Sequence, residues 1–384
     1  MKKKRIWSLL LVLFLTMGFV QTPVLAEAAA VQTESVTLTD ENRYNPEYYE
    51  EPEAAYPLAG KSISRAARTQ QTLEEYIVAA LENFEETIDV SAYNVSRETA
   101  YEEYFRILNN NPQLFYVAGK CGISAYQGAS TILSYKVTYL YNKETAIQMC
   151  EELEAAAEQA VAQVDTSLND YEQALIVHDY LVQNCEYDYE NYQNNRVPDI
   201  SHTAYGSLVN RMAVCDGYSD AFSYIMEQKL GISCDVVSSQ AMAHAWNMIE
   251  IGGKWYHVDA TWDDPTGDNI GRVVHNYFLL SSSKISDSEH KHISWNELHV
   301  ADSTTYDNAF WSKITSAICR NNGSWYYSKY QEDENDVTMQ QAVKLVKKDE
   351  LLSGSEEPVF STSVWTTGDG RYYTSSYMYL AKAD

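Results

Sequence analysis

The sequence predicts an α+β protein, because helical and strand-like patterns occupy separate stretches of the chain. Apolar residues recur at helical spacing over 73–84 and again over 218–230. Two strand-like runs, 245–251 and 254–259, flank Gly252-Gly253, a dipeptide suited to a two-residue hairpin turn. Together these patterns predict several helices and an antiparallel hairpin.

The first 26 residues have the three-part layout of a secretory signal peptide. Four basic residues at 2–5 precede an apolar run at 6–20, and small residues follow. The apolar run is short for a membrane span, and no cysteine stands at the cleavage-like site, which argues against a lipoprotein. We therefore expect a secreted, extracellular protein, free or held at the cell wall, with no membrane attachment after cleavage.

The next two parts of the chain differ in composition. Residues 27–70 are polar and acidic, with Pro46 and Pro52 as breaks, and are predicted to form a mobile acidic linker. Residues 71–165 are predicted to be an N-terminal α+β segment. Its expected elements are helices at 73–84, 101–108 and 143–164, with strands at 114–117 and 133–141.

A candidate nucleophile stands in the following region, 166–300. Cys215 lies directly before the helix predicted at 218–230, which ends at Gly231. The unpaired N–H groups and the dipole at a helix N-terminus favour thiolate over thiol, and they can also hold an oxyanion. The position of Cys215 is therefore suited to nucleophilic catalysis.

The predicted hairpin supplies a base and a carboxylate. In the register that Gly252-Gly253 sets, Trp246 faces Asp259, so Asp259 is the diagonal neighbour of His244 on the same face of the sheet. A bulge in either strand would separate them. Cys215, His244 and Asp259 thus have the residue types and the order of a thiol nucleophile, its general base and the group that orients the base.

Four segments resemble the transglutaminase-like superfamily: TAYGSL (203–208), VCDGY (214–218), HAWN (244–247) and WYHVDATWDDP (255–265). The resemblance covers about residues 170 to 300 and is strongest to the secreted bacterial branch. It implies a papain-like α+β core, with the cysteine at a helix N-terminus packed on an antiparallel sheet that carries His and Asp. It also implies acyl transfer through a thioester, ending on an amine or on water. We expect no metal or other cofactor.

The resemblance does not choose among reactions, since the family includes peptidases, cross-linking enzymes and inactive members. We expect hydrolysis of peptide or side-chain amides, because water is the default acyl acceptor. The expected substrate is a peptide or protein, with cell-wall peptide as one class. The alternatives are a protein cross-linking transglutaminase and a non-catalytic binding module at the cell surface.

Accessory residues are less clearly marked. The family places a side-chain donor upstream of the cysteine to hold the oxyanion, and Tyr205 or His202 fits that place, with plain packing as the alternative. Trp246 is a candidate for contact with substrate, although an aromatic residue on a strand usually packs, and the same holds for Trp262. Asp263 and the acidic residue after it are expected in a solvated turn.

The remaining histidines do not form a recognisable metal motif. They lack the paired short spacings of structural zinc sites, and no cysteine is close in sequence, so no metal ligands are assigned. His178 lies on an apolar helical stretch, 171–184, and is expected to pack or cap. The histidines expected to be loop or structural residues are His275, His290, His292 and His299.

Charge restricts the partners. The chain has 28 basic and 54 acidic residues, and removal of the four basic residues of segment 1–26 leaves 24 basic residues and a net charge of −30. Such a chain repels nucleic acid and anionic lipid. Neither is therefore an expected partner, whereas a basic protein or an amine-bearing peptide would be attracted. The sequence does not indicate an oligomeric state.

The chain contains six cysteines. If Cys215 is a free thiol, five cysteines remain, which leaves room for a structural bridge but excludes complete pairing.

Residues 301–384 are predicted to be a β-rich C-terminal region. Turns before aromatic strands, at 321–327 and 368–373, repeat about 47 residues apart, which is compatible with propeller blades or with ordinary hairpins.

Overall fold

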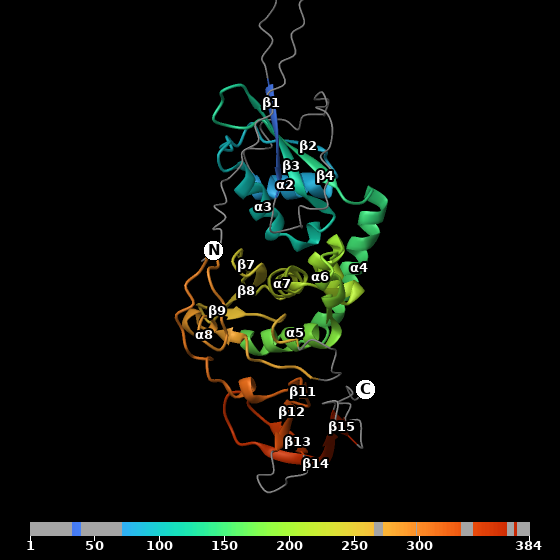
Figure 1. The fold of residues 1–384 in the computed structure, drawn as a ribbon, viewed down its shortest axis with the longest axis vertical. Helices are drawn as coiled ribbons and strands as arrows, with labels where there is room; N and C mark the ends of the chain where they lie inside the picture. The colour runs from blue at the N-terminus through green and yellow to red at the C-terminus, as the bar shows by residue number, and fades with distance from the viewer. Residues whose placement is uncertain are drawn as a thin grey trace, which may run out of the picture. The chain divides into compact units, whose positions relative to one another are not determined.

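The structure is a computed structural model that describes residues 33–39, 71–264, 272–296, 298–331, 341–366 and 372–374 (Figure 1). The predicted signal peptide, 1–26, and most of the predicted linker, 27–70, lie outside the described residues. Among the helices that are described, none combines the length and apolar character that a membrane crossing requires. Contacts divide the chain into two units; the second contains Tyr141 and the residues after it, together with Asn109–Phe115.

The first unit is built on a four-stranded antiparallel sheet with the order β1-β3-β4-β2. Its first strand lies in the segment expected to be a mobile linker, and it pairs with β3 from Thr33↔Tyr126 to Thr39↔Lys120. The sequence TESVTLT is rich in β-branched residues, which favour strands, so local propensity prevails there over the acidic surroundings. The strands are β1 Thr33–Thr39, β2 Thr87–Asp89, β3 Val117–Tyr126 and β4 Ser134–Tyr139.

Two helices accompany this sheet, α2 Leu73–Glu82 and α3 Ala100–Asn109, close to the predicted positions. A capping box starts α2: the Glu75 amide donates to the Thr72 hydroxyl, and the Thr72 amide donates to the Glu75 carboxylate. The strand predicted at 114–117 is wrong. A short 3-10 helix, Pro112–Leu114, reaches its first residue, because proline favours the first turn of a helix; a turn follows at 115–116, and β3 begins only at Val117.

The second unit contains the antiparallel sheet that carries the predicted hairpin, with the order β10-β9-β8-β7. The predicted register is confirmed from Ile251↔Lys254 to Asn247↔Val258. Gly252 and Gly253 both have positive φ, 59° and 77°, as a two-residue hairpin turn requires. The strands are β7 Cys234–Ser239, β8 His244–Ile251, β9 Lys254–Val258 and β10 Phe278–Leu280.

One helix, α7 (Cys215–Ser223), packs directly on β8 (Figure 1). The Asn247 side chain fixes this packing by donating to the Ser219 carbonyl at 2.9 Å. The helix continues as a π-helical turn, Tyr224–Lys229, and ends before Gly231, whose φ of 70° supplies the left-handed residue expected after a helix. The other helices of this unit are α4 Lys143–Val161, α5 Asp170–Asn184, α6 Tyr189–Gln193 and α8 Ser282–Ile285.

The fourth helix, α4, belongs to the second unit, although the sequence placed it in the N-terminal segment that ends at 165. Its acidic face explains this assignment. Glu152 accepts from the Tyr205 hydroxyl at 2.5 Å, and Glu154 accepts from the Tyr224 hydroxyl at 2.8 Å and pairs with Lys229. These partners lie far along the chain, so the sequence pattern of α4 does not reveal them.

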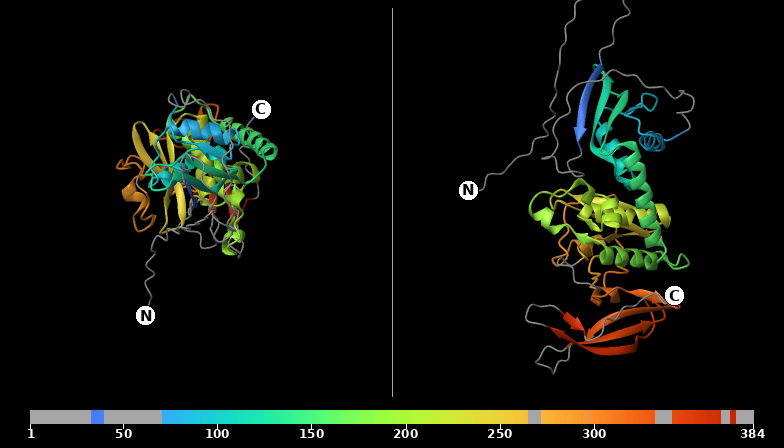
Figure 2. Two further views of the ribbon diagram at one scale, coloured as in Figure 1. Left: turned by 90° about the horizontal axis from the view of Figure 1, so that it is seen from above. Right: turned by 90° about the vertical axis from the view of Figure 1, so that its right-hand side faces the viewer.

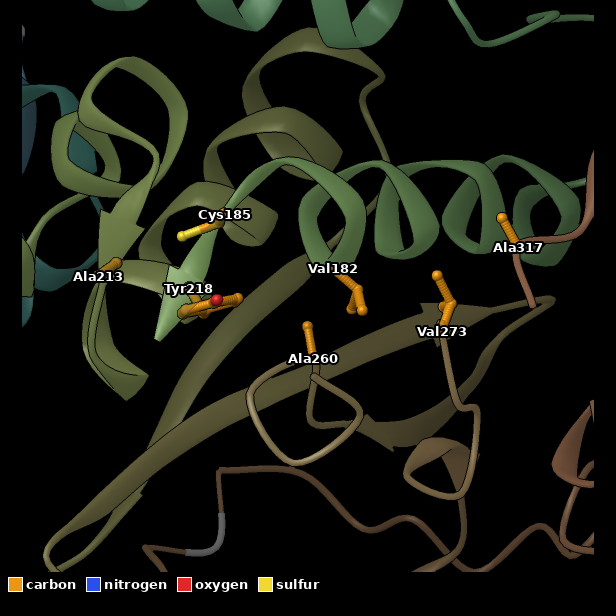
Figure 3. Packing of buried hydrophobic residues seen from close by; sticks show 7 residues of the cluster. All are labelled: Val182, Cys185, Ala213, Tyr218, Ala260, Val273 and Ala317. Carbon is orange, nitrogen blue, oxygen red and sulfur yellow. The ribbon is translucent and has the colours of Figure 1, made fainter. Parts of the chain in front are cut away.

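A buried cluster joins α5 and α7 to the loop after β9 (Figure 3). Val182 of α5 and Tyr218 of α7 pack with Ala260, which directly follows Asp259. Burial of this kind stabilises by roughly 25 cal/mol for each Å² of apolar surface. The cluster therefore anchors the segment that carries Asp259. Its members are Val182, Cys185, Ala213, Tyr218, Ala260, Val273 and Ala317.

The C-terminal strands form one antiparallel meander, β11-β12-β13-β14-β15, shown in orange and red in Figure 2. Both turn-then-aromatic repeats lie in this single sheet, at its two edges and separated by β13, so they are not separate propeller blades. Asn322 and Gly323 form the first turn with φ of 48° and 82°; residues 368–371 of the second lie outside the described residues. The strands are β11 Cys319–Asn321, β12 Ser324–Gln331, β13 Gln341–Lys348, β14 Glu357–Thr366 and β15 Tyr372–Thr374.

Candidate functional site

Cys215 is the first residue of α7 and is half-buried. Chain packing at this helix start is tight: a Cβ built on Gly217 would lie 2.6 Å from the Ser201 carbonyl and 2.8 Å from the Cβ of Ala213. Only glycine fits, which explains the glycine two positions after the cysteine. The Val214 amide donates to the same Ser201 carbonyl at 2.9 Å and fixes the approach to the helix.

His244 and Asp259 meet as the hairpin register predicts. His244 Nε2 lies 2.7 Å from Asp259 Oδ2. A carboxylate oxygen accepts, so Nε2 carries hydrogen, and Nδ1 of the neutral ring keeps its lone pair for a proton. Ala243, the residue before His244, has a φ of 49°, a left-handed conformation that is uncommon for a side chain with a Cβ. Such local strain is typical of functional sites.

The thiol lies beside the first residues of β8. The backbone N–H of Ala245, which follows His244, donates to the sulfur of Cys215, and the negative charges of Asp216 and Asp259 both act on that sulfur. Together with the packing of α7 on β8, these contacts bring Cys215, His244 and Asp259 into one site. The arrangement offers a nucleophile, a base with a defined tautomer and an anion that can stabilise the charged base.

The resting state of the thiol differs from the sequence-based expectation. Burial, followed by the charge of Asp216, raises the pKa of Cys215 well above its ordinary value, despite the helix N-terminus. The thiol donates to Asp216 Oδ1 at 3.5 Å, and Oδ2 of the same carboxylate lies 2.8 Å from His202 Nδ1. The expectation of a stabilised thiolate was wrong because it omitted both burial and the carboxylate at the next position.

The carboxylate of the triad is strongly favoured as an anion. Burial alone would raise the pKa of Asp259, but the charges and hydrogen bonds of His244 and His292 outweigh it and hold the pKa well below its usual range. The Trp262 amide donates to the other carboxylate oxygen at 3.1 Å. Asp259 is therefore charged and fixed at any pH at which His244 can act as a base.

The two accessory residues expected from the sequence have other roles in this structure. The Tyr205 hydroxyl donates to Glu152 on α4, so its proton is already engaged in a hydrogen bond. Trp246 is completely buried, and its Nε1 donates to His257 Nδ1 at 3.0 Å. Its ring stacks on His244 with centroids 5.7 Å apart. Trp246 thus packs against the His244 imidazole, and its burial leaves no surface for contact with substrate.

Tyr187 is a second tyrosine near the cysteine, one that the sequence did not reveal. It pairs with Ala213, two residues before the cysteine, in the short parallel ladder of β5 (Glu186–Tyr187) and β6 (Met212–Ala213). Burial raises its pKa most, and the charge of Cys215 is the next cause, with Asp259 further down. The hydroxyl therefore shares the surroundings of the sulfur. Only the tertiary pairing of two strands far apart in sequence brings it there.

His292 was expected to be a loop or structural residue, but it touches the triad. It is fully buried, and its Nε2 lies 2.9 Å from Asp259 Oδ2, the oxygen that His244 also contacts. Trp262 is 37% exposed and lies over both imidazoles, with ring centroids 5.4 Å from His244 and 4.4 Å from His292. No spacing rule links His292 to His244, so this contact could not be predicted from the sequence.

A second network of buried polar side chains is connected to Asp259 through the backbone of Asp263. His178 bridges Asp179 at 2.9 Å and Asp263 at 3.1 Å, and His275 reaches Asp179 at 2.8 Å. Asp263 is fully buried, so the expectation of a solvated turn was wrong. The Tyr277 amide donates to both oxygens of Asp263 at 3.1 Å, which holds the turn that follows Asp259.

Three groups of the described residues have donor atoms close enough together for a metal ion. In two of them the donors already satisfy one another by direct hydrogen bonds, and one of these two includes the triad residues His244 and Asp259. In the third group, Asp287 and His290 are hydrogen-bonded at 2.7 Å, and Glu289 is exposed. The groups are His178/Asp179/His275, His244/Asp259/His292 and Asp287/Glu289/His290.

Comparison with known proteins agrees with this geometry. A model of the transglutaminase-like superfamily core matches residues 157–260, which include Cys215, His244 and Asp259. Residues 157–260 are a transglutaminase-like superfamily domain. Domains of this type are typically cysteine enzymes that act on amides by acyl transfer. The transglutaminase-like domain thus coincides with the helix and strands that form the site.

Solved structures and curated proteins show little further similarity. A solved crystal structure of a TGase shares 17% identity, with a TM-score of 0.28, over 44% of this chain and 49% of its own. The matched part of this chain thus spans about half the length of that structure. No curated protein matches the sequence significantly.

Proposed function

We propose that this protein is a cysteine acyl-transfer enzyme that acts on peptide or side-chain amides through a Cys215-His244-Asp259 triad. The hydrogen bond from His244 Nε2 to Asp259 Oδ2 is the observation that supports this most strongly. It fixes the imidazole tautomer that a thiol nucleophile needs and provides an anion to stabilise the imidazolium that forms.

The proposed reaction begins with transfer of the Cys215 proton to His244 Nδ1. The sulfur attacks the amide carbonyl carbon, and the carbonyl electrons move to oxygen, giving a tetrahedral oxyanion. The Cys215 backbone N–H at the start of α7 and the Tyr187 hydroxyl are the proposed donors to that oxyanion. The imidazolium then protonates the leaving amine as the C–N bond breaks, which leaves a thioester on Cys215.

Hydrolysis is the proposed second half of the cycle. His244 takes a proton from water, the resulting hydroxide attacks the thioester, and the thiolate leaves and recovers the proton. The raised pKa of Cys215 fits this cycle, because the thiol needs its base at neutral pH and the free sulfur is protected when no substrate is present.

Cross-linking is the second candidate, and one observation favours it. The partly exposed carboxylate of Asp216 lies next to the sulfur, and Asp199 and Asp220 act on the same His202 that Asp216 contacts. Negative charge at this place would attract an ammonium group, which could replace water as the acyl acceptor after losing a proton. The products then differ: a new amide instead of a free acid.

A product analysis with the full chain distinguishes these reactions. The protein is incubated with a mixture of Gln-containing and cell-wall peptides and a biotin-labelled primary amine, and the peptides are then identified by mass spectrometry. Hydrolysis predicts cleaved or deamidated peptides without label, and cross-linking predicts labelled peptides. Both signals must disappear in C215A and H244A. Peptides that are bound but unchanged by the wild-type protein would support the third reading, a non-catalytic binding module.

We also propose that the protein acts outside the cell, at or near the cell wall. The support is the signal-like segment 1–26 and the high negative charge of the remaining chain. Expression of the full chain in a secreting host, followed by mass measurement of the protein in the medium, tests this location. The expected mass is that of a chain cleaved near Ala26 or Ala30. Retention of the uncleaved chain in the membrane fraction would contradict the proposal.

A further inference from the structure

Asp259 has two histidine partners at one oxygen atom. His244 Nε2 and His292 Nε2 lie 2.7 and 2.9 Å from Oδ2, whereas Oδ1 accepts from the Trp262 amide. A carboxylate that is shared in this way cannot rotate without breaking a contact. The second histidine lies outside residues 157–260, the part of the chain that the transglutaminase-like core model matches.

The partners of His292 determine which of its ring atoms carry hydrogen. Nε2 faces the carboxylate of Asp259, and Nδ1 faces the backbone carbonyl of His290 at 3.0 Å. Both oxygens can only accept when Asp259 is ionised, so both ring nitrogens of His292 donate, and the ring is an imidazolium. Two buried groups, one cation and one anion, thus compensate each other.

Neighbouring His257 shows the opposite pattern. Its Nδ1 accepts from Trp246 Nε1, and its Nε2 contacts the Ser282 hydroxyl at 3.0 Å, so a neutral ring satisfies both contacts. Burial and then the charge of His292 lower the pKa of His257 to about 3. The positive charge in this part of the site therefore belongs to His292 and not to His257.

The backbone around His292 is built to hold the ring. Its amide donates to the Ile285 carbonyl at the end of α8 at 3.0 Å. Lys291 and Ser294, on either side, have φ of 61° and 55°, in the left-handed region that residues with a Cβ seldom adopt. Ala243 before His244 has the same feature. Both histidines that contact Asp259 are thus presented by unusual backbone, as expected for residues under functional constraint.

We propose that His292 is a positioning residue of this site, an imidazolium that clamps Asp259 so that Asp259 can hold His244 with Nδ1 toward Cys215. The inference depends on the proposed function, since it assigns His292 to the same triad. His292 does not touch the reacting atoms. Its charge also offsets part of the negative charge of Asp259, which sets how firmly His244 holds its proton.

The groups that face His292 define what else can affect a pH profile. Asp259 lies in direct contact. The rings of His244 and Tyr277 lie 5.6 and 5.5 Å from the His292 ring, and His257 senses its charge. The remaining walls are the indoles of Trp246 and Trp262, at 4.6 and 4.4 Å.

The test follows alkylation of Cys215 by iodoacetamide in the full-length protein between pH 5 and 9. Trypsin releases residues 212–229, a peptide in which Cys215 is the only cysteine, so its labelling can be read separately from the other thiols. The variants are H292A, H292Q, H244A and the control H299A. His299 pairs with Asp235 and stacks on Trp255, and it is partly exposed.

The proposal predicts a specific pattern. H292A slows alkylation at the wild-type optimum at least tenfold. H292Q recovers much of that loss, because the glutamine amide can still donate to Asp259. Without the cation, however, the acidic limb of the pH–rate profile of H292Q moves to higher pH by roughly one unit. H299A matches the wild type. A shift of the limb and rescue by glutamine are effects that mere structural support would not produce.

Other results overturn one proposal or the other. If H244A slows alkylation but neither His292 variant does, or if both slow it equally without a shift of the limb, the role of His292 is refuted and the triad stands. If H244A itself has no effect, the proposed function fails. Should both His292 variants fail to fold by circular dichroism, ¹⁵N NMR of the wild-type histidine side chains decides. A neutral His292 ring at pH 7 would refute the clamp.

Discussion

His178 Nε2 and Asp263 Oδ2 lie 3.1 Å apart, and this contact joins α5 to the turn that follows Asp259. Both side chains are fully buried. The Asp263 amide donates back to the Asp259 carbonyl at 3.2 Å, so the position of the triad carboxylate depends on a histidine 81 residues earlier in the chain, His178. The helix α5 thereby contributes to the site without supplying a group that reacts.

The first prediction concerns stability. H178A should lower the free energy of unfolding by about 3–5 kcal/mol, because it leaves the buried carboxylates of Asp179 and Asp263 without their shared partner. Urea denaturation followed by tryptophan fluorescence measures this. The control is H299A, at a partly exposed pair with Asp235, where a loss below about 1 kcal/mol is expected. Equal losses in the two variants would refute the importance of the buried network.

The second prediction is that the contribution of His178 to the free energy of unfolding depends on pH. Burial alone would lower the pKa of His178, but its hydrogen bonds to Asp179 and Asp263 and their charges raise it to about 9. An unfolded histidine titrates near 6.5. The stabilisation is therefore complete below about pH 6.5 and is lost as the pH rises through about 9. The stability difference between wild type and H178Q should shrink between pH 6 and 9.5. A constant difference would contradict the assignment.

The third prediction concerns the carboxylate beside the nucleophile. Asp216 raises the pKa of Cys215, so D216N should increase the rate of iodoacetamide alkylation at pH 7.5, by up to about tenfold for each unit by which the thiol pKa falls. The tryptic peptide 212–229 reports the labelling. D235N, on β7 and paired with His299, is the control and should leave the rate unchanged. A slower reaction in D216N would show that Asp216 activates the thiol.

The fourth prediction compares two tyrosines. Y187F should lower kcat for hydrolysis of p-nitrophenyl acetate by about 10²-fold, the usual cost of losing one oxyanion donor, with little change in KM. Y205F should have a small effect, since its hydroxyl is engaged by Glu152. A large loss in Y205F together with an active Y187F would reverse the assignment and return the oxyanion role to the residue that the sequence suggested.

The hairpin that carries His244 could be predicted from sequence because its determinants are local. Gly252-Gly253 permits only a tight turn, and the period of two in a strand then fixes which side chains share a face. Asp259 lies one residue beyond the last observed pair, Asn247↔Val258, and still reaches His244. A motif that depends on a turn and a strand register can thus be predicted from a single sequence.

His292, Tyr187 and Asp263 could not be assigned in the same way. Each depends on contacts between segments that no periodicity connects: His292 is 33 residues from Asp259, and Tyr187 reaches the site through a two-residue ladder. The pKa of Cys215 was also misjudged, since a helix N-terminus is visible in a sequence and burial is not. Local order predicted the reacting groups, while tertiary packing determines how they are held.

The most direct test of the account is the detection of an acyl group on Cys215. The full-length protein is mixed with p-nitrophenyl acetate, quenched in acid within the first turnover and digested with trypsin. The peptide 212–229 is then examined for an added acetyl group. A Cys215-His244-Asp259 triad predicts acetylation at Cys215 in the wild type, a strong reduction in H244A, and none at this position in C215A. Equal acetylation in the wild type and H244A, or none in either, would contradict a triad in which His244 activates Cys215.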